Sequence, residues 1–170
     1  MASIHTSASS LRYIPPTEDN VLGSYQEVYQ ANRHRLFALA FWMTDNELLA
    51  EELMKQTFHR AFALSAYPSA EFLDRTLIAG LRKLMPLGKL SLNCDICTEA
   101  MGVRRNTMRV HLERAIVQVP PTERLVFLMH DVEDYDDELI GRCLGLSEME
   151  IKCAAHQARL RIRELLSTMS

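Results

Sequence analysis

The sequence lacks any apolar run close to the roughly 20 residues that a helix needs to cross a bilayer. Its first segment, MASIHTSASSLRYIPP, has neither the charged flank nor the apolar core of a secretion signal. A glycine-rich phosphate loop is also absent, and only 6 of the 170 residues are glycine. We therefore expect a cytoplasmic protein that makes no membrane contact and needs no cofactor.

Cysteine is scarce too, with four residues in a chain whose 48% hydrophobic content can build a core without disulfide bonds. We therefore expect free thiols. Cys94 and Cys97 form a C-x-x-C pair, which fits either a zinc or redox site or two small buried side chains. No second pair and no H-x-x-x-H segment follows at ligand spacing, so we predict no metal site.

The chain has no overall positive charge, because its formal net charge is −3. Nucleic-acid binding must therefore depend on a local basic surface or on a partner. Residues 86–118 hold five Lys and Arg against three acids, whereas residues 119–170 hold six against ten. The six histidines are scattered, with no nucleophile or paired carboxylate beside them. We predict no catalytic residues and no enzyme activity.

Helical periodicity and helix-breaking residues divide the chain. Apolar residues recur at helical spacing in three segments of the first half, which are 21–43, 47–64 and 71–85. Pro15-Pro16 precedes them, and Pro86 and Gly88 follow them. The predicted parts are a loose arm at 1–20, a three-helix bundle at 21–85, a linker at 86–111 and a second helical domain at 112–170.

A helix-turn-helix is predicted at residues 138–152. Such a motif needs a small residue where its helices cross and a glycine in the turn, and Gly141 and Gly145 meet these needs. Ser147 can cap the second helix. The apolar residues that would join the two helices are Ile140, Leu144, Leu146 and Ile151. A plain helical hairpin is the alternative.

The second helix of this motif offers polar residues to a major groove. The candidate DNA-binding residues are Lys152, Gln157, Arg159, Arg161 and Arg163. DNA contact is a separate hypothesis, because six acids in residues 131–138 precede the motif and repel phosphates.

A fainter, more basic copy of the pattern lies at residues 95–115. Gly102 takes the place of Gly145, and Met108 that of Ile151. Two interpretations stay open for its Arg104, Arg105 and Arg109: additional nucleic-acid contacts, or an ordinary solvated helix face.

Two ordered sets of motifs give the chain a family resemblance. The first half contains LFALAFWMT at 36–44 and AEELMKQTFHRAF at 50–62. The second half contains VPPTERLVFL at 119–128, ELIG at 138–141 and LGLS at 144–147. This order and spacing resemble the extracytoplasmic-function (ECF) class of bacterial RNA polymerase sigma factors.

The resemblance implies an all-α protein with two small helical domains. The first is a three-helix bundle like sigma region two, and the second is a helix-turn-helix domain like sigma region four. It also implies three partners: core RNA polymerase, promoter DNA and an anti-sigma factor. The implied polymerase-binding residues are Glu51, Glu52, Lys55 and Gln56, and Arg82 and Lys83 are further implied DNA contacts.

The chain departs from the family pattern at several positions that we expect on functional surfaces. Asp74 and Leu81 replace a tryptophan and an asparagine of the promoter-melting helix, and melting requires aromatic stacking. Lys55, Ala154 and Gln157 are further departures. Core positions such as Leu36, Leu53, Phe58, Leu144 and Ile151 keep their character. Two hypotheses follow: a promoter-using sigma factor, or a sigma-like regulatory or decoy module that has lost promoter melting.

Overall fold

The computed structural model describes residues 18–93 and 109–169, and every regular element in these ranges is helical. The elements are α1 (Glu18–Thr44), α2 (Glu47–Leu64), α3 (Ala70–Leu81), α4 (Arg109–Gln118), α5 (Pro121–Phe127), the π-helical turn η1 (Leu128–Val132), α6 (Asp137–Leu144) and α7 (Glu148–Thr168). The all-α prediction is confirmed. None of these helices combines the length and apolar character needed to cross a membrane.

The predicted helix boundaries are close to the observed ones. Asn46 caps α2 by accepting a hydrogen bond from Leu49 N at 3.0 Å, and Ser69 caps α3 by accepting one from Phe72 N at 3.2 Å. Helix α3 ends at Leu81, four residues before the predicted end at 85, because the chain tightens into a turn there. Helix α4 begins at Arg109, inside the predicted linker.

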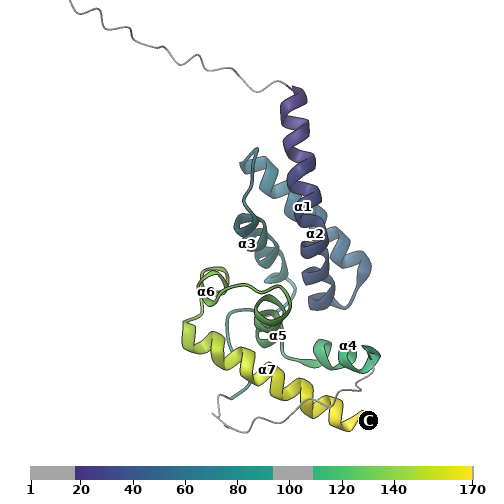
Figure 1. The fold of residues 1–170 in the computed structure, drawn as a ribbon, viewed down its shortest axis with the longest axis vertical. Helices are drawn as coiled ribbons and strands as arrows, with labels where there is room; N and C mark the ends of the chain where they lie inside the picture. The colour runs from purple at the N-terminus through teal and green to yellow at the C-terminus, as the bar shows by residue number, and fades with distance from the viewer. Residues whose placement is uncertain (1–17, 94–108, 170) are drawn as a thin grey trace, which may run out of the picture.

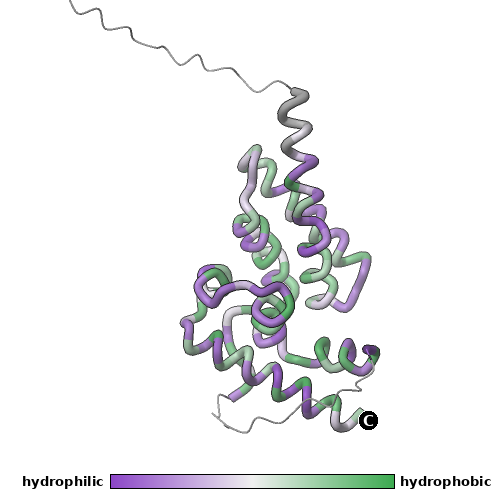
Figure 2. The backbone as a smooth tube through the Cα atoms, in the orientation of Figure 1, coloured by the Kyte–Doolittle hydropathy of each residue, from purple (hydrophilic) through white to green (hydrophobic). Residues whose placement is uncertain are grey.

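The helices form two groups that touch one another (Figure 1). Helices α1, α2 and α3 pack together as the N-terminal bundle, and α4 to α7 gather at its lower end as the C-terminal bundle. Helix α6 lies against α3, and α4 and α5 reach α1. Figure 2 shows apolar and polar positions alternating along the helices, as expected when one face of each helix is buried.

The buried apolar side chains make one connected core that runs through both bundles. Leu36 and Phe58 lie in the N-terminal bundle, and Leu125 and Ile151 lie in the C-terminal bundle. The five residues predicted to keep core character are all buried. The prediction of a surface location is wrong for three residues, however, because Asp74, Leu81 and Ala154 are at most 1% exposed.

The cysteine prediction needs one correction. Cys143 is a free, buried thiol, as expected. Cys153 is disulfide-bonded, which contradicts the expectation of free thiols. Cys94 and Cys97 lie outside the described residues.

Arg124 at the start of α5 joins the ends of two other helices. Its guanidinium donates to the carbonyl oxygens of Trp42 at 3.3 Å and Met43 at 3.2 Å, in the last turn of α1. It also donates to the carbonyls of Val117 and Val119 at the end of α4. Terminal helix carbonyls have no partner within their own helix, so one cation satisfies four of them. Burial lowers the pKa of Arg124, although the charge of Asp45 opposes this.

The two residues before Arg124 hold the segment that follows the N-terminal bundle. Thr122 Oγ1 accepts a hydrogen bond from Gly88 N at 3.2 Å. Glu123, fully buried, accepts from Leu92 N at 2.7 Å and from Ser91 N. The first turn of α5 therefore binds residues 88–92 on one side and the ends of α1 and α4 on the other.

Replacing Arg124 with Met should lower the free energy of unfolding by about 3 kcal/mol, because several helix-end carbonyls lose a charged donor. Urea denaturation followed by circular dichroism measures the change. Arg60→Met, on the exposed side of α2, is the matched control and should change stability by less than about 0.5 kcal/mol. Equal stabilities of the two variants would contradict the role assigned to Arg124.

Candidate nucleic-acid and polymerase interfaces

Helices α6 and α7 and the turn between them form the predicted helix-turn-helix. Gly145 has φ of +76°, a left-handed conformation that favours glycine. A Cβ on Gly141 would stand 2.9 Å from the Leu146 carbonyl oxygen and 3.4 Å from Ile151 Cδ1. The two helices therefore cross too closely for a side chain at residue 141. Both glycine predictions are confirmed.

A capping box begins α7. Ser147 Oγ accepts a hydrogen bond from Glu150 N at 3.3 Å, and Glu150 Oε2 accepts one from Ser147 N at 2.8 Å. At the start of α6, Asp136 accepts a hydrogen bond from Leu139 N at 2.6 Å. Capping fixes the first turn of α7, which presents Glu148, Met149 and Lys152 to solvent.

Three of the predicted DNA-binding cations on α7 are already paired with carboxylates of the same chain. Lys152 pairs with Glu148, and Arg161 with Glu164 at 2.6 Å. Arg159 donates from Nε to Asp131 Oδ2 at 2.6 Å and from Nη2 to Asp131 Oδ1. Any DNA phosphate must compete with these carboxylates. Arg163 and Gln157 are half-buried on the same helix.

Asp131 is the most firmly held of these carboxylates. It lies on η1, directly after His130, whose Nδ1 is 2.6 Å from Asp131 Oδ1. Partial burial works against its charge, but hydrogen bonds from Arg159 and His130 outweigh this and lower the pKa of Asp131. The acidic segment that was predicted to repel phosphates therefore also engages an arginine of α7.

The predicted basic copy is only partly within the described residues. Arg104 and Arg105 lie outside them. Arg109 is exposed at the start of α4 and forms an ion pair with Glu113 at 2.7 Å.

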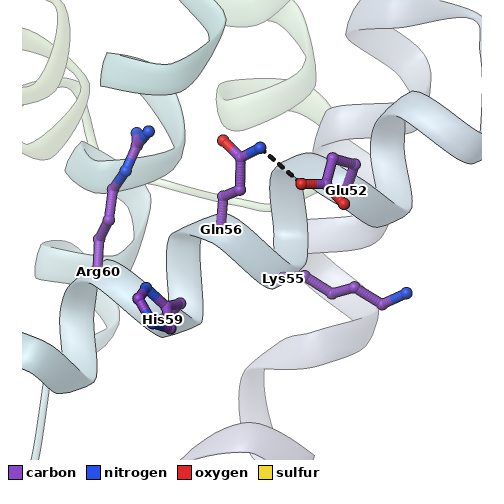
Figure 3. Close-up of a pocket in the computed structure, with 5 residues that line it drawn as sticks. All are labelled: Glu52, Lys55, Gln56, His59 and Arg60. Carbon is purple, nitrogen blue, oxygen red and sulfur yellow. Dashed lines mark hydrogen bonds between the residues drawn. The ribbon is translucent and has the colours of Figure 1, made fainter.

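The predicted polymerase-binding residues share the outer side of α2. Lys55 pairs with Glu51 at 2.6 Å, and Gln56 Nε2 donates to Glu52 Oε1 at 2.6 Å. The hydrogen bond and charge of Glu51 raise the pKa of Lys55. A shallow pocket is lined by Glu52, Lys55, Gln56, His59 and Arg60. Figure 3 shows Lys55 extending away from the bonded Gln56 and Glu52. Its ammonium group is exposed but paired with Glu51, so an incoming protein would have to compete with that carboxylate.

A polar seam joins α3 to the helix-turn-helix, and of its residues only Asp74 and Arg82 stood out in the sequence. Asp74 is buried in α3, where it accepts hydrogen bonds from Arg35 of α1 and from the Tyr135 hydroxyl at 2.8 Å. The Arg35 guanidinium carbon also lies 5.6 Å from the centre of the Tyr135 ring. Residues 35, 74 and 135 are far apart in the chain, and no local pattern links them.

Two further contacts complete this seam. Arg82 Nη2 donates to the carbonyl oxygens of Leu144 at 2.9 Å and Cys143 at 3.4 Å, at the end of α6. Arg142 of α6 donates to both carboxylate oxygens of Glu71, at 3.2 and 3.3 Å. Arg82, a predicted DNA contact, is thus bonded to the motif's first helix. Its neighbour Lys83 is exposed.

Burial raises the pKa of Asp74 from 3.8 to about 6, although Arg35 opposes the shift and the nearby Glu133 and Glu71 add to it. The folded protein thus keeps a proton that the unfolded chain releases between about pH 4 and pH 6. Stability should therefore fall as the pH rises from about 4 to about 6 and level off above that. The difference between the two pKa values corresponds to roughly 3 kcal/mol.

This pH dependence can be measured by urea denaturation from pH 4 to pH 8 in the wild type and in Asp74→Asn, which cannot titrate. The difference between the two curves isolates Asp74 from the histidines, which titrate in the same range. Parallel curves would show that Asp74 has an ordinary pKa.

The crossing of α6 and α7 supports a second prediction. Gly141→Ala should lower the free energy of unfolding by about 1 to 3 kcal/mol, because the new Cβ overlaps the Leu146 carbonyl. Thermal denaturation measures the loss. Gly23→Ala in α1, where a Cβ meets nothing within 4 Å, is the control and should be neutral or slightly stabilising. A neutral Gly141→Ala would show that the crossing is looser than observed.

Comparison with known proteins shows what this arrangement of helices resembles. Residues 109–162 match the family described as sigma-70, region 4, and they include all of α4, α5, η1 and α6 and most of α7. The chain is also similar to the protein named ECF RNA polymerase sigma factor SigE of Mycolicibacterium smegmatis. The two are 22% identical over 162 residues, which cover 86% of this chain and 63% of that protein. Residues 109–162 are thus similar to region 4 of the sigma-70 type, and the predicted resemblance to ECF sigma factors is confirmed.

Proposed function

We propose that this chain is a sigma-like transcription initiation protein that binds core RNA polymerase and directs it to promoter DNA. The observation that carries the proposal is the capped helix-turn-helix of α6 and α7, which lies within the region 4 match. The similarity to an ECF sigma factor, over 86% of the chain, extends the argument to the N-terminal bundle. The proposal assigns binding roles and no catalytic residue.

The proposed DNA-binding element is α7. Its first turn is fixed by the capping box and exposed, which suits a helix that enters a major groove by its N-terminal end. Lys152, Arg159 and Arg161 would exchange their carboxylate partners for phosphates, and Arg163 and Gln157 lie farther along the helix. In this proposal Arg109 adds a contact from α4.

The proposed polymerase-binding element is the outer side of α2. Glu51, Glu52, Lys55 and Gln56 lie there within two consecutive turns. Lys55 and Gln56 are exposed, and both are already oriented by bonds to acids on the same helix. Orientation before binding reduces the side-chain entropy lost in a complex. Binding to core RNA polymerase would place this protein in the cytoplasm. An anti-sigma factor would compete with the polymerase for the same surfaces.

The second candidate is a sigma-like regulatory or decoy module that has lost promoter melting. Asp74 favours it, because the residue that replaces the family's tryptophan has no aromatic ring to stack on a base and also lies buried inside the protein. The division into domains at 21–85 and 112–170, joined by 86–111, is common to both candidates.

Core polymerase binding separates these candidates from other functions. Immobilised wild-type protein should retain bacterial core RNA polymerase, and Lys55→Glu should weaken the binding by about tenfold, because it reverses a charge within the proposed interface. Lys89→Glu, an equal charge reversal at an exposed position outside α2, is the control. Equal retention by both variants would exclude α2 as the binding element.

Run-off transcription on genomic fragments then distinguishes the two candidates. A holoenzyme that produces specific transcripts supports the initiation protein. Polymerase binding without transcripts supports the regulatory module. No binding of core polymerase by the wild type would contradict both candidates.

A further inference from the structure

The exposed part of α7, the proposed DNA-binding helix, is short. Glu148, Met149, Glu150 and Lys152 are exposed at its start, whereas every residue from 153 to 163 is buried or half-buried. The start of α7 lies at the edge of the C-terminal bundle, beside α6 (Figure 1). A DNA groove that receives α7 by its N-terminal end therefore meets these exposed side chains before any others of the helix.

One of these side chains is already engaged within the fold. Glu150 Oε2 accepts hydrogen bonds from Ser147 N at 2.8 Å and from Ser147 Oγ at 2.7 Å. These bonds lower the pKa of Glu150 and hold its carboxylate in the capping box. The other three residues, Glu148, Met149 and Lys152, are called the entry turn below. Helical geometry places them within an arc of about 100° on one side of α7.

Glu148 is the unusual member of the entry turn, because a carboxylate at the front of a DNA-binding helix has the same charge as the phosphates. Its side chain is 70% exposed and forms an ion pair with Lys152. The hydrogen bond and charge of Lys152 lower the pKa of Glu148, so the carboxylate is ionised at neutral pH. When a phosphate binds Lys152, Glu148 loses its partner inside a groove rich in negative charge.

A carboxylate released in this way needs a hydrogen-bond donor on a base. The base edges of the major groove offer two amino groups, N4 of cytosine and N6 of adenine, whereas guanine and thymine present acceptors there. The adenine amino group lies beside the N7 acceptor, which repels a carboxylate, and cytosine has no acceptor on this edge. Cytosine is therefore the base that best satisfies Glu148.

Met149 brings a different chemistry to the entry turn. It is 70% exposed although its side chain is large and apolar, and its thioether is only a weak hydrogen-bond acceptor. The apolar group that a base presents in the major groove is the 5-methyl group of thymine. A flexible methionine can pack on this group without exact placement. Met149 follows Glu148 directly, so the thymine should lie close to the cytosine.

We propose that the entry turn reads a cytosine and a neighbouring thymine in promoter DNA. Glu148 accepts a hydrogen bond from N4 of the cytosine, Met149 packs on the 5-methyl group of the thymine, and Lys152 binds an adjacent phosphate. Lys152 then positions the helix, and the other two residues supply specificity. Guanine or thymine at the cytosine position is rejected, because it leaves the Glu148 carboxylate unpaired. This inference rests on the proposed function and adds the base preference of its DNA site.

The base preference is measured with holoenzyme assembled from the full chain and bacterial core RNA polymerase. The holoenzyme selects from a pool of promoter-length duplexes with a randomised upstream segment, and the bound duplexes are sequenced. The wild type should enrich a site that contains the cytosine and the thymine. Glu148→Gln should move the preference at the cytosine position toward adenine, because a glutamine amide bonds both N6 and N7 of adenine. Its binding to the original site should weaken about tenfold, as for one lost base contact.

The role of Met149 is tested from both sides of the contact. Deoxyuridine in place of the selected thymine removes only the 5-methyl group, and it should weaken wild-type binding about fourfold, the effect of one buried methyl group. Met149→Ala should bind the thymine site more weakly than the wild type does. The same variant should no longer distinguish thymine from deoxyuridine. Fluorescence anisotropy with labelled duplexes measures these affinities.

Glu164→Gln is the matched control for Glu148→Gln. Glu164 is also an exposed acid of α7 with a cationic partner, Arg161, but it lies near the opposite end of the helix. Its substitution removes the same charge and one ion pair, so the selected sequence should stay that of the wild type. Thermal denaturation checks that the variants are folded, as expected for substitutions of exposed residues.

An unchanged base preference in both Glu148→Gln and Met149→Ala would overturn this inference. A wild-type holoenzyme that binds DNA without enriching any sequence would overturn it too. An equal change of preference in Glu164→Gln would show a general effect of charge, which also contradicts base reading by Glu148. Failure of the proposed function is distinguishable from these results, because it appears as absent core polymerase binding by the wild type.

Discussion

The half-buried guanidinium of Arg124 is the constraint on which the rest of the structure depends. A cation partly withdrawn from water needs acceptors, and here they are the terminal carbonyls of α1 and α4. This arrangement fixes the start of α5 relative to both bundles. Glu123 and Thr122, held in place by the same turn, then attach residues 88–92. The position of the helix-turn-helix under α3 follows from this first turn of α5.

The connection between the bundles combines an apolar core with a polar seam, and the two parts have different consequences. The core is continuous through both bundles and supplies most of the favourable free energy, but apolar contacts alone specify relative orientation weakly. Arg35, Asp74 and Tyr135 accept only one geometry, because each donor must meet a carboxylate oxygen. The seam therefore sets the orientation of the bundles, and one of its members, Arg82, is also a predicted DNA contact.

Local features of the fold were predictable from the sequence, whereas pairings between distant residues were not. Periodicity located the helices, and the steric needs of Gly141 and Gly145 located the motif, because both signals lie within a few residues. The burial of Asp74 was missed, since a lone acid in a helix is normally solvated and its partners lie 39 and 61 residues away. The same reason hid the pairing of Arg159 with Asp131, 28 residues apart. Arg104 and Arg105 lie outside the described residues, and their role stays a prediction.

The paired cations of α7 bear on how such a helix would choose among DNA sequences. Lys152, Arg159 and Arg161 each carry a built-in counterion from their own chain, so a phosphate that displaces it replaces one oxyanion with another. The exchange brings little net Coulomb energy, and non-specific DNA, which offers mainly phosphates, gains little from it. A base edge in the correct position offers hydrogen bonds that the internal carboxylates do not supply. Pairing of these cations within the chain thus lowers the affinity for nucleic acid in general. Discrimination between sequences then depends on how well α7 fits the base edges in the groove.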